Sequence, residues 1–193
     1  MKKLELFWPV KNVAINYPFG YKHEIYTNMG MAGHNGIDLN CFVGEPIYAA
    51  HDGLVTYAGV DSREGWGVVI RTNEPFLDDI KIPHYWKTIS WHLLSNIPVK
   101  AGQSVQAGDV IGYGDTTGLA TGPHLHFGLK PIAQGENEWS WYNILQQNGY
   151  FGAVDPAPYM STLTAYQLKT TLKSISEILK KISELLTFWS KKR

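Results

Sequence analysis

Short apolar runs alternate with turn-forming residues over the first 158 residues of the chain. Six runs of five to seven residues are rich in β-branched or aromatic side chains: PIYAA, GLVTYAG, GVVIRT, TISWHLL, DVIGYG and HLHFGL. Gly, Asn, Asp and Pro separate these runs, as they commonly separate the strands of a sheet. The pattern therefore predicts a mainly β domain.

Two segments between the runs have a different character. The stretch Glu74–Trp86 contains two prolines and an acidic pair, and we expect a loop inserted between two strands. The segment WSWYNILQQNG, at residues 139–149, predicts a short helix that ends at Gly149. The two prolines of Asp155–Pro158 disfavour both a helix and a central strand, and they predict a domain boundary.

From about Ser161 the pattern becomes that of a helix, so we expect a domain at residues 1–158 and a helical segment at 161–193. Apolar residues recur at alternating spacings of four and three, a heptad rhythm of about three heptads. Position a holds Leu172, Leu179 and Leu186; position d holds Leu168, Ile175, Ile182 and Trp189; position g holds Ile178 and Leu185. Leu at a with Ile at d favours bundles of more than two helices, which predicts a homo-oligomer through residues 165–189.

The net charge of the chain becomes informative only when residues 1–160 and 161–193 are counted separately. The 193 residues carry 17 basic and 17 acidic side chains, and only 18% are charged, which argues against disorder and against a nucleic-acid partner. Residues 161–193 hold seven basic and two acidic side chains, a net charge of +5, which leaves −5 on residues 1–160. This basic amphipathic helix could pack against other helices or lie on an anionic membrane or wall. The unbroken heptad favours packing.

The single cysteine and the N-terminus exclude other classes. Cys41 alone can form neither an intramolecular disulfide nor a cysteine-based zinc site, and its apolar neighbours predict a buried side chain. Glu5 and Pro9 interrupt the first residues too early for a signal peptide, so we expect none. No segment reaches the roughly 18 apolar residues of a membrane span.

Histidines in two segments suit a metal ion. His124 and His126 flank Leu125, so on a strand both imidazoles would project from one face. His34 and Asp38 would lie about 13 Å apart on a straight strand, and we expect the glycines at 33 and 36 to bend the chain between them. Ordinary packing or an Asn-Gly hairpin would explain either segment taken alone.

His92 lies inside an aromatic strand, where a hydrogen-bonded core role is the usual explanation. Two histidines and one aspartate from separate segments, however, would form a three-ligand zinc site with an open fourth position, as in catalytic zinc. The sequence contains no HExxH motif, so histidine would have to carry out the acid and base chemistry. We expect structural or surface roles for His23, His51 and His84, and sheet packing rather than ligand contact for Tyr85, Trp86, Trp139, Trp141 and Tyr142.

The spacing H-x3-D, a histidine before leucine in an aromatic strand, and H-x-H together resemble the M23 family of LytM/lysostaphin-type zinc endopeptidases, which cut peptidoglycan cross-bridges. GHNGIDL, EPIYAAHDGLVTYAG and VKAGQSVQAGDVIGYGDTTGLATGPHLHFGL are similar to that family in order and spacing. The resemblance runs from about Tyr17 to Leu129.

The resemblance implies a small antiparallel β barrel or sandwich with an open groove over one zinc ion. It implies that His34, Asp38 and His126 bind zinc and that His92 and His124 are the catalytic pair. Family members commonly have an upstream tyrosine that stabilises the oxyanion, and Tyr26 is the nearest here, with Tyr21 and Tyr17 before it. Trp91, where a smaller residue is common, and the Glu74–Trp86 insertion depart from the family and could reshape the groove.

The implied function is hydrolysis of peptide cross-links in bacterial peptidoglycan, outside the cytoplasm, by a phage lysin, a virion component or a protein exported without a signal peptide. Two alternatives remain. One is a catalytically inactive module that binds the wall or regulates a partner enzyme, although such a module would be expected to lack ligands. The other is an assembly component that uses its C-terminal helix.

Overall fold

The computed structural model describes residues 1–133 and 145–190. The strands are β1 Leu6–Trp8, β2 Ile15–Tyr17, β3 Ile37–Asn40, β4 Pro46–Tyr48, β5 Gly53–Asp61, β6 Gly65–Thr72, β7 Phe76–Leu77, β8 Pro83–Leu93, β9 Ser104–Val105, β10 Val110–Tyr113, β11 His124–Ile132 and β12 Met160–Thr164. The helices are α1 Glu24–Asn28, the short 3₁₀ helix η1 Ala157–Tyr159, and α2 Ala165–Ser190.

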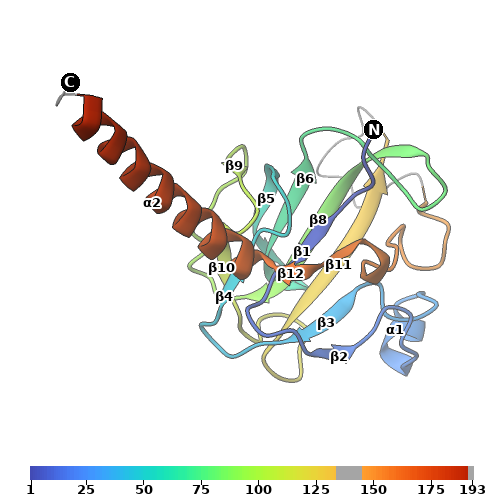
Figure 1. Cartoon of the computed structure of the whole chain (residues 1–193). Helices are drawn as coiled ribbons and strands as arrows, with labels where there is room; N and C mark the ends of the chain where they lie inside the picture. Colours follow the sequence, from blue (N-terminus) through green and yellow to red (C-terminus); the bar gives the residue numbers. More distant parts are fainter. Residues whose placement is uncertain (134–144, 191–193) are drawn as a thin grey trace.

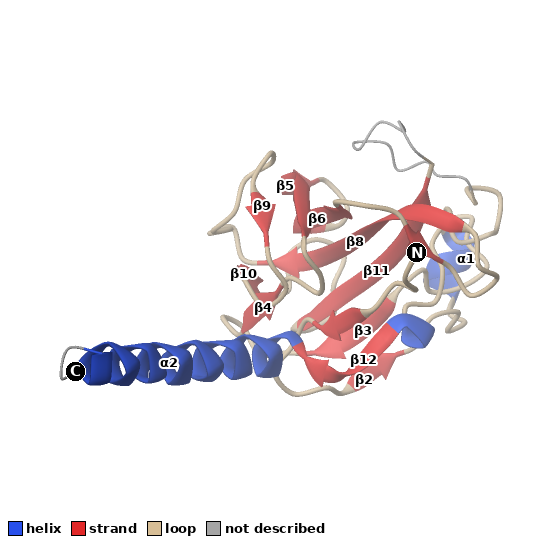
Figure 2. Ribbon diagram, turned by 45° about the horizontal axis from the view of Figure 1, so that its top comes forward, coloured by secondary structure: helices blue, strands red, loops and turns tan. Residues whose placement is uncertain are grey.

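The strands form one large antiparallel sheet and two small ones (Figure 1). The large sheet has the order β2-β3-β11-β8-β6-β5-β9, and β7 pairs with the outer part of β8. β4 pairs with β10, and β1 pairs in parallel with β12. The mainly β prediction is confirmed, since each of the six apolar runs overlaps a strand. The three sheets together are called the β body below. Figure 2 shows α2 leaving the β body as a single projecting helix.

A single main core joins the three sheets. It includes Leu6 of β1, Ile47 of β4, Val68 and Ile70 of β6, and Leu125 and Phe127 of β11, each at most 1% exposed, and it also takes in the buried Cys41. Val69, which alternates with Val68 and Ile70, packs with Ile89 and Trp91 on the opposite face of the large sheet. The alternation of side chains along a strand therefore gives this sheet a core face and an outer face.

The segment Glu74–Trp86 is a hairpin rather than the predicted loop. β7 pairs with the start of β8, where Pro83 needs no ladder N–H because it is the first strand residue. Asp78 closes the turn: its Oδ1 accepts from the amides of Ile80 and Ile82 at 3.0 and 2.8 Å, and His84 Nε2 lies 3.0 Å from its Oδ2. His84 thus has the structural role that was expected.

Two further expectations concern the segments after β11. The helix predicted at residues 139–149 falls mostly outside the described residues, as do Trp139, Trp141 and Tyr142, and Leu145–Gln147 forms a turn. The C-terminal helix begins at Ala165 rather than near Ser161, because residues 160–164 form β12 beside β1. Thr164 and Gln167 fix this start through a reciprocal capping box of 3.1 and 2.8 Å.

None of the described helices is both long enough and apolar enough to cross a membrane. The exposed apolar residues of α2 alternate with lysines, glutamates and hydroxyl side chains. The helix is therefore amphipathic rather than uniformly apolar.

The core position of Trp86, at the end of the hairpin segment Glu74–Trp86, predicts a loss of stability when its side chain is removed. Trp86 is 1% exposed, its Nε1 donates to the Phe76 carbonyl at 3.1 Å, and its ring lies 5.0 Å from that of Tyr159. We expect Trp86→Ala to lower the free energy of unfolding by about 3–5 kcal/mol, measured by urea denaturation, because it empties a packed core site.

Tyr85 provides the matched control, since it is only half-buried and its ring contacts Arg71 at 5.3 Å. Tyr85→Ala should cost no more than about 1 kcal/mol. Equal losses for the two variants would mean that Trp86 is not part of the core.

Candidate active site

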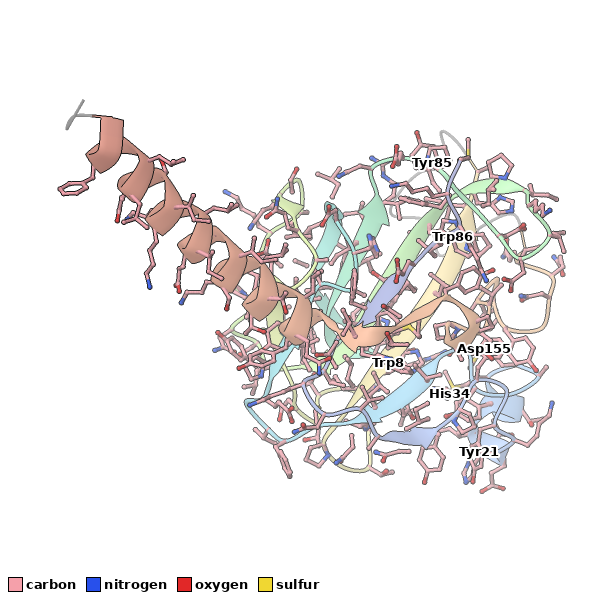
Figure 3. All side chains as sticks on the ribbon, viewed as in Figure 1. Trp8, Tyr21, His34, Tyr85, Trp86 and Asp155 are labelled. Carbon is pink, nitrogen blue, oxygen red and sulfur yellow. The ribbon has the colours of Figure 1, made fainter. Side chains whose placement is uncertain are left out.

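Three strands bring the predicted site residues together on the outer face of the large sheet. β11 lies between β3 and β8, and its His126 is the register partner of both Asp38 on β3 and Trp91 on β8. Leu125 and Phe127 point into the core, so His124 and His126 share the other face, as the H-x-H spacing predicted. His34 comes from the bend that precedes β3; in Figure 3 it lies toward the α1 side of the β body.

His34, Asp38 and His126 converge on one point. His34 Nε2 lies 3.1 Å from Asp38 Oδ1 and 2.9 Å from His126 Nδ1, and His126 Nδ1 lies 3.2 Å from the same carboxylate oxygen. His34 Nδ1 donates to the Pro18 carbonyl at 3.2 Å, which leaves Nε2 as the ligand atom. Burial would raise the pKa of Asp38, but hydrogen bonds from His126 and His34 outweigh it and hold the pKa well below its usual range.

These donors fit a metal ion. Two imidazole nitrogens and one carboxylate oxygen, all within 4.8 Å of one another, make the one group of three or more such donors found in the described residues. Nitrogen and carboxylate ligands suit Zn²⁺, and three protein ligands leave a fourth position for water or substrate. The residues present therefore fit a catalytic zinc ion rather than a closed structural one.

Gly33 and Gly36 are positions where other atoms of the protein pass too close to the backbone for a Cβ to fit. A Cβ on Gly33 would lie 2.7 Å from the Gly20 carbonyl oxygen, and one on Gly36 would lie 2.7 Å from both His126 Cε1 and the Phe127 carbonyl oxygen. Neither glycine has a positive φ. The expected bend is present on both sides of His34, but the glycines are needed because backbone and imidazole pass where a side chain would stand.

His92 reaches the outer face through a β-bulge. Trp66 pairs with Leu93 while Gly67 pairs with Trp91, so His92 is the extra residue, and its φ is +64°. Trp91 packs on the outer face and Leu93 in the main core, which shows that the side-chain alternation reverses at this residue. Bulges often re-aim a side chain beside a functional site, and here the bulge places the His92 ring 4.6 Å from that of His124.

Both histidines of this pair donate Nδ1 to a backbone carbonyl. His92 Nδ1 donates to Thr117 O at 2.7 Å, and His124 Nδ1 donates to Gly122 O at 2.8 Å. Each ring therefore keeps Nε2 free to exchange a proton, and His124 Nε2 lies 3.8 Å from Asp38 Oδ2. Burial, followed by the charge of His126, lowers the pKa of His92 to about 4, so its imidazole is neutral at pH 7.

The site opens into a cleft of about 590 Å³ that contains all five residues. Tyr17, Tyr21 and Tyr26 all line it, and Tyr26 stacks on His34 with ring centroids 5.2 Å apart. Burial, and then the charge of Asp38, raises the pKa of Tyr26, which keeps its hydroxyl protonated and able to donate. This contact distinguishes Tyr26 from the other two tyrosines.

The two departures from the family pattern have different positions. No residue of Glu74–Trp86 lines the cleft, so the insertion does not shape it. Trp91 is 2% exposed, packs against Tyr57, and leaves no room for a Cβ at Gly67. It contributes instead to a second cleft of about 420 Å³ that shares His126 and Glu64 with the first.

Sequence reasoning missed Thr117 and Glu64. Thr117 supports His92 twice: its carbonyl accepts from the ring, and its hydroxyl donates to Leu93 O at 2.7 Å and accepts from Trp66 N at 3.1 Å. Glu64 borders both clefts from the β5–β6 turn. A threonine or a glutamate in a turn carries no spacing signal that would single it out.

His51, which was expected to have a structural or surface role, is buried and hydrogen-bonded to Thr88 Oγ1 at 3.0 Å.

The close approach at Gly36 generates a prediction for metal binding. Gly36→Ala would push a methyl group into the His126 ring, so we expect Zn²⁺ affinity to fall roughly 10–100-fold, measured by competition with a chromophoric chelator. Gly122→Ala is the matched control, because a Cβ there meets nothing within 4 Å and its φ is not positive. Unchanged zinc affinity in Gly36→Ala would contradict the ligand role of His126.

Comparison with known proteins agrees with this geometry. Glycyl-glycine endopeptidase ALE-1 of Staphylococcus capitis is 36% identical over 115 residues, covering 58% of this chain and 29% of that protein. Peptidoglycan DD-endopeptidase ShyA of Vibrio cholerae is 35% identical over 125 residues, covering 58% and 26%. The chain thus spans less than a third of the length of these curated relatives.

Among solved structures, the catalytic domain of lysostaphin from Staphylococcus simulans superposes with a TM-score of 0.54 at 26% identity. The match covers 77% of this chain and 92% of that domain. Residues 32–138, more than half of the chain, match the model of peptidase family M23. This segment contains all five residues of the site: His34, Asp38, His92, His124 and His126. The chain therefore belongs to peptidase family M23, with His34, Asp38 and His126 as its metal-site residues.

Proposed function

We propose that this protein is a zinc-dependent endopeptidase that hydrolyses peptide cross-links of bacterial peptidoglycan. One observation carries the proposal: a three-donor metal set with an open position and a pair of histidines with free Nε2 atoms line the floor of one cleft. An inactive wall-binding module would not need this combination. Peptidoglycan lies outside the cytoplasm, so the proposed reaction takes place there.

The ligand set fits zinc, which when bound supplies a Lewis acid that lowers the pKa of coordinated water and polarises the scissile carbonyl. His34, Asp38 and His126 would hold the ion. Asp38 stays ionised because both histidines hydrogen-bond to it, and His34 keeps the correct tautomer through Pro18. The three side chains are at least four-fifths buried, which limits competition from bulk water.

His92 and His124 are proposed as the acid/base pair. Both rings donate Nδ1, so each accepts a proton at Nε2 when its imidazole is neutral, as that of His92 is. Their 4.6 Å centroid separation places both within the same reaction volume. One histidine takes a proton from the attacking water at Nε2. The other first takes up a proton at Nε2 from solvent and then donates it to the leaving amine or to the tetrahedral oxyanion.

Tyr26 is proposed as the oxyanion donor. Its ring is fixed by stacking on His34, and its hydroxyl remains protonated because burial and Asp38 raise its pKa. A positioned neutral hydroxyl stabilises negative charge that develops on a carbonyl oxygen during attack. Tyr21 lies against Tyr17 at 4.7 Å and is more exposed, which makes it less well fixed for this role.

The names of the two relatives indicate the substrate class but not the bond. One is called a glycyl-glycine endopeptidase and the other a peptidoglycan DD-endopeptidase, so both glycine bridges and D-amino-acid cross-links are candidates. The cleft and its Trp91-lined neighbour determine which residues fit on either side of the scissile bond. Mass spectrometry of products from defined muropeptides would identify it.

Alanine variants of the proposed acid/base pair and of a proposed ligand should distinguish proton transfer from metal binding. We expect His92→Ala and His124→Ala each to retain one equivalent of zinc and to lose peptidoglycan hydrolysis by at least about 10²-fold. His126→Ala should lose zinc and activity together. Zinc content measured by atomic absorption and turbidity loss of purified cell walls test this. His84→Ala, outside the cleft, is the control; loss of zinc from His92→Ala would make His92 a ligand and refute its assignment.

Thr117 is proposed as a positioning residue for His92. Thr117→Val removes the hydroxyl that joins Leu93 and Trp66, so the carbonyl that orients His92 becomes less fixed. We expect kcat to fall about tenfold with zinc affinity unchanged, because a small displacement of a catalytic group is costly. The neighbouring exposed Thr116→Val should leave kcat unaltered. An equal effect of both substitutions would rule out a specific role for Thr117.

A further inference from the structure

The C-terminal helix is firmly attached at its start and uncovered along the rest of its length. Tyr166 packs against Tyr48 with centroids 5.9 Å apart, Lys169 pairs with Asp109 at 2.5 Å, and the capping box fixes the first turn. Every residue from 171 to 188 is exposed. Figures 1 and 2 agree that no other described element lies beside this part of α2.

The exposed part carries a continuous apolar stripe. At roughly 100° per residue, the apolar side chains from Leu172 to Leu186 fall within an arc of about 140°. They are Leu172, Ile175, Ile178, Leu179, Ile182, Leu185 and Leu186, each 46–66% exposed. The helix is 26 residues and therefore about 39 Å long. An uncovered stripe of this length is typical of an interaction surface rather than of solvent-exposed structure.

The positions of the charged side chains on α2 favour a second copy of the same helix as the partner. In the heptad with Leu172 at position a, the lysines at 173, 180 and 181 and the glutamates at 177 and 184 occupy the outer positions b, c and f. Positions e hold Ser176 and Ser183, and positions g hold Ile178 and Leu185. From 171 to 188 no charge occupies position a, d, e or g. Lys181 at c is the charged side chain nearest the stripe, one turn from Ile178 and Leu185, and the apolar g positions widen the contact for a bundle.

An anionic surface is a poorer match for the same helix. Over the described residues 165–190 there are four lysines and two glutamates, and Lys169 is already paired with Asp109. The lysines at 173, 180 and 181 each have a glutamate at the i±4 spacing that favours a pair within one helix. Between residues 171 and 188 this mixed face has a net charge of only +1, and the further basic residues Lys191, Lys192 and Arg193 follow it in the sequence.

The β body leaves room for such a bundle. It contacts the first turns through Tyr166 and Lys169, which lie about 170° and 130° around the helix from the centre of the apolar stripe. Identical helices could therefore meet along the stripe while the β bodies stay on the outside. Figure 3 shows the side chains of α2 projecting freely beyond the β body.

We infer that α2 assembles this protein into a parallel homo-oligomer of three or four chains, whose partner surface is the same apolar stripe on other copies. Leu at all three a positions with Ile at the d positions 175 and 182 is the combination that favours more than two helices. Several catalytic clefts would then project from one stalk, which increases retention on a polymeric substrate. The assembly itself does not depend on the proposed hydrolysis.

Light scattering and sedimentation velocity of the full chain test the inference. We expect a mass three to four times the 21.7 kDa of one chain at micromolar concentration. Ile175→Lys with Ile182→Lys places charge at two d positions and should give monomers. Thr170→Lys with Thr187→Lys adds the same charge at the outer positions f and b, about 130° from the centre of the stripe, and should remain oligomeric. Zinc binding should be unchanged in both, which shows that the β body is folded.

Three outcomes would overturn the inference. The wild-type chain could be monomeric, or the Ile175/Ile182 variant could keep the wild-type mass, which would place the contact elsewhere. The third outcome is monomeric protein that sediments with phosphatidylglycerol vesicles but not with phosphatidylcholine vesicles, because the stripe would then bind a lipid surface. Cell-wall hydrolysis is not needed for any of these measurements.

Discussion

The active site depends on the pairing of β11 with β3 on one edge and β8 on the other. The two ladders place His126 opposite Asp38 and beside Trp91, so residues far apart in sequence share one patch of the outer face. Since side chains alternate along a strand, a shift of either ladder by one residue would turn half of the patch into the core. The fully buried Leu125 and Phe127 oppose that shift, and core packing therefore also holds the metal ligands in register.

Periodicity and spacing predicted much of this arrangement. The six apolar runs mark strands, and the H-x-H pattern places two imidazoles on one face because the intervening leucine belongs to the core. The H-x3-D spacing pointed to a bend because a straight strand could not bring His34 to Asp38. What this reasoning did not supply is the role of Gly36, whose missing Cβ admits the His126 ring from a distant strand. That contact is tertiary, and local sequence does not encode it.

Other features depended on interactions that a local pattern does not reveal. Pro75 and Pro83 suggested a loop, yet a short hairpin forms because Asp78 closes its turn and Trp86 gains a core position. Residues 160–164 pair with β1, which lies at the other end of the chain, so the helix starts later than its composition indicated. The Thr164-x-x-Gln167 capping box did mark that start in the sequence. The bulge at His92 had no such signal, although it gives the histidine its direction.

The segment from Asp115 to Gly122 holds both members of the histidine pair, since the carbonyls of Thr117 and Gly122 each accept an Nδ1 proton. Its own backbone is tied back to the strands by the Asp115 amide, which donates to His92 O at 2.9 Å. Surface turns usually tolerate changes in length, but here the Nδ1 protons of His92 and His124 are both held by carbonyls of one short stretch of backbone. An insertion or deletion in this turn would alter both tautomers together. The turn therefore sets the tautomers of the histidine pair through its backbone, although none of its side chains need touch the metal.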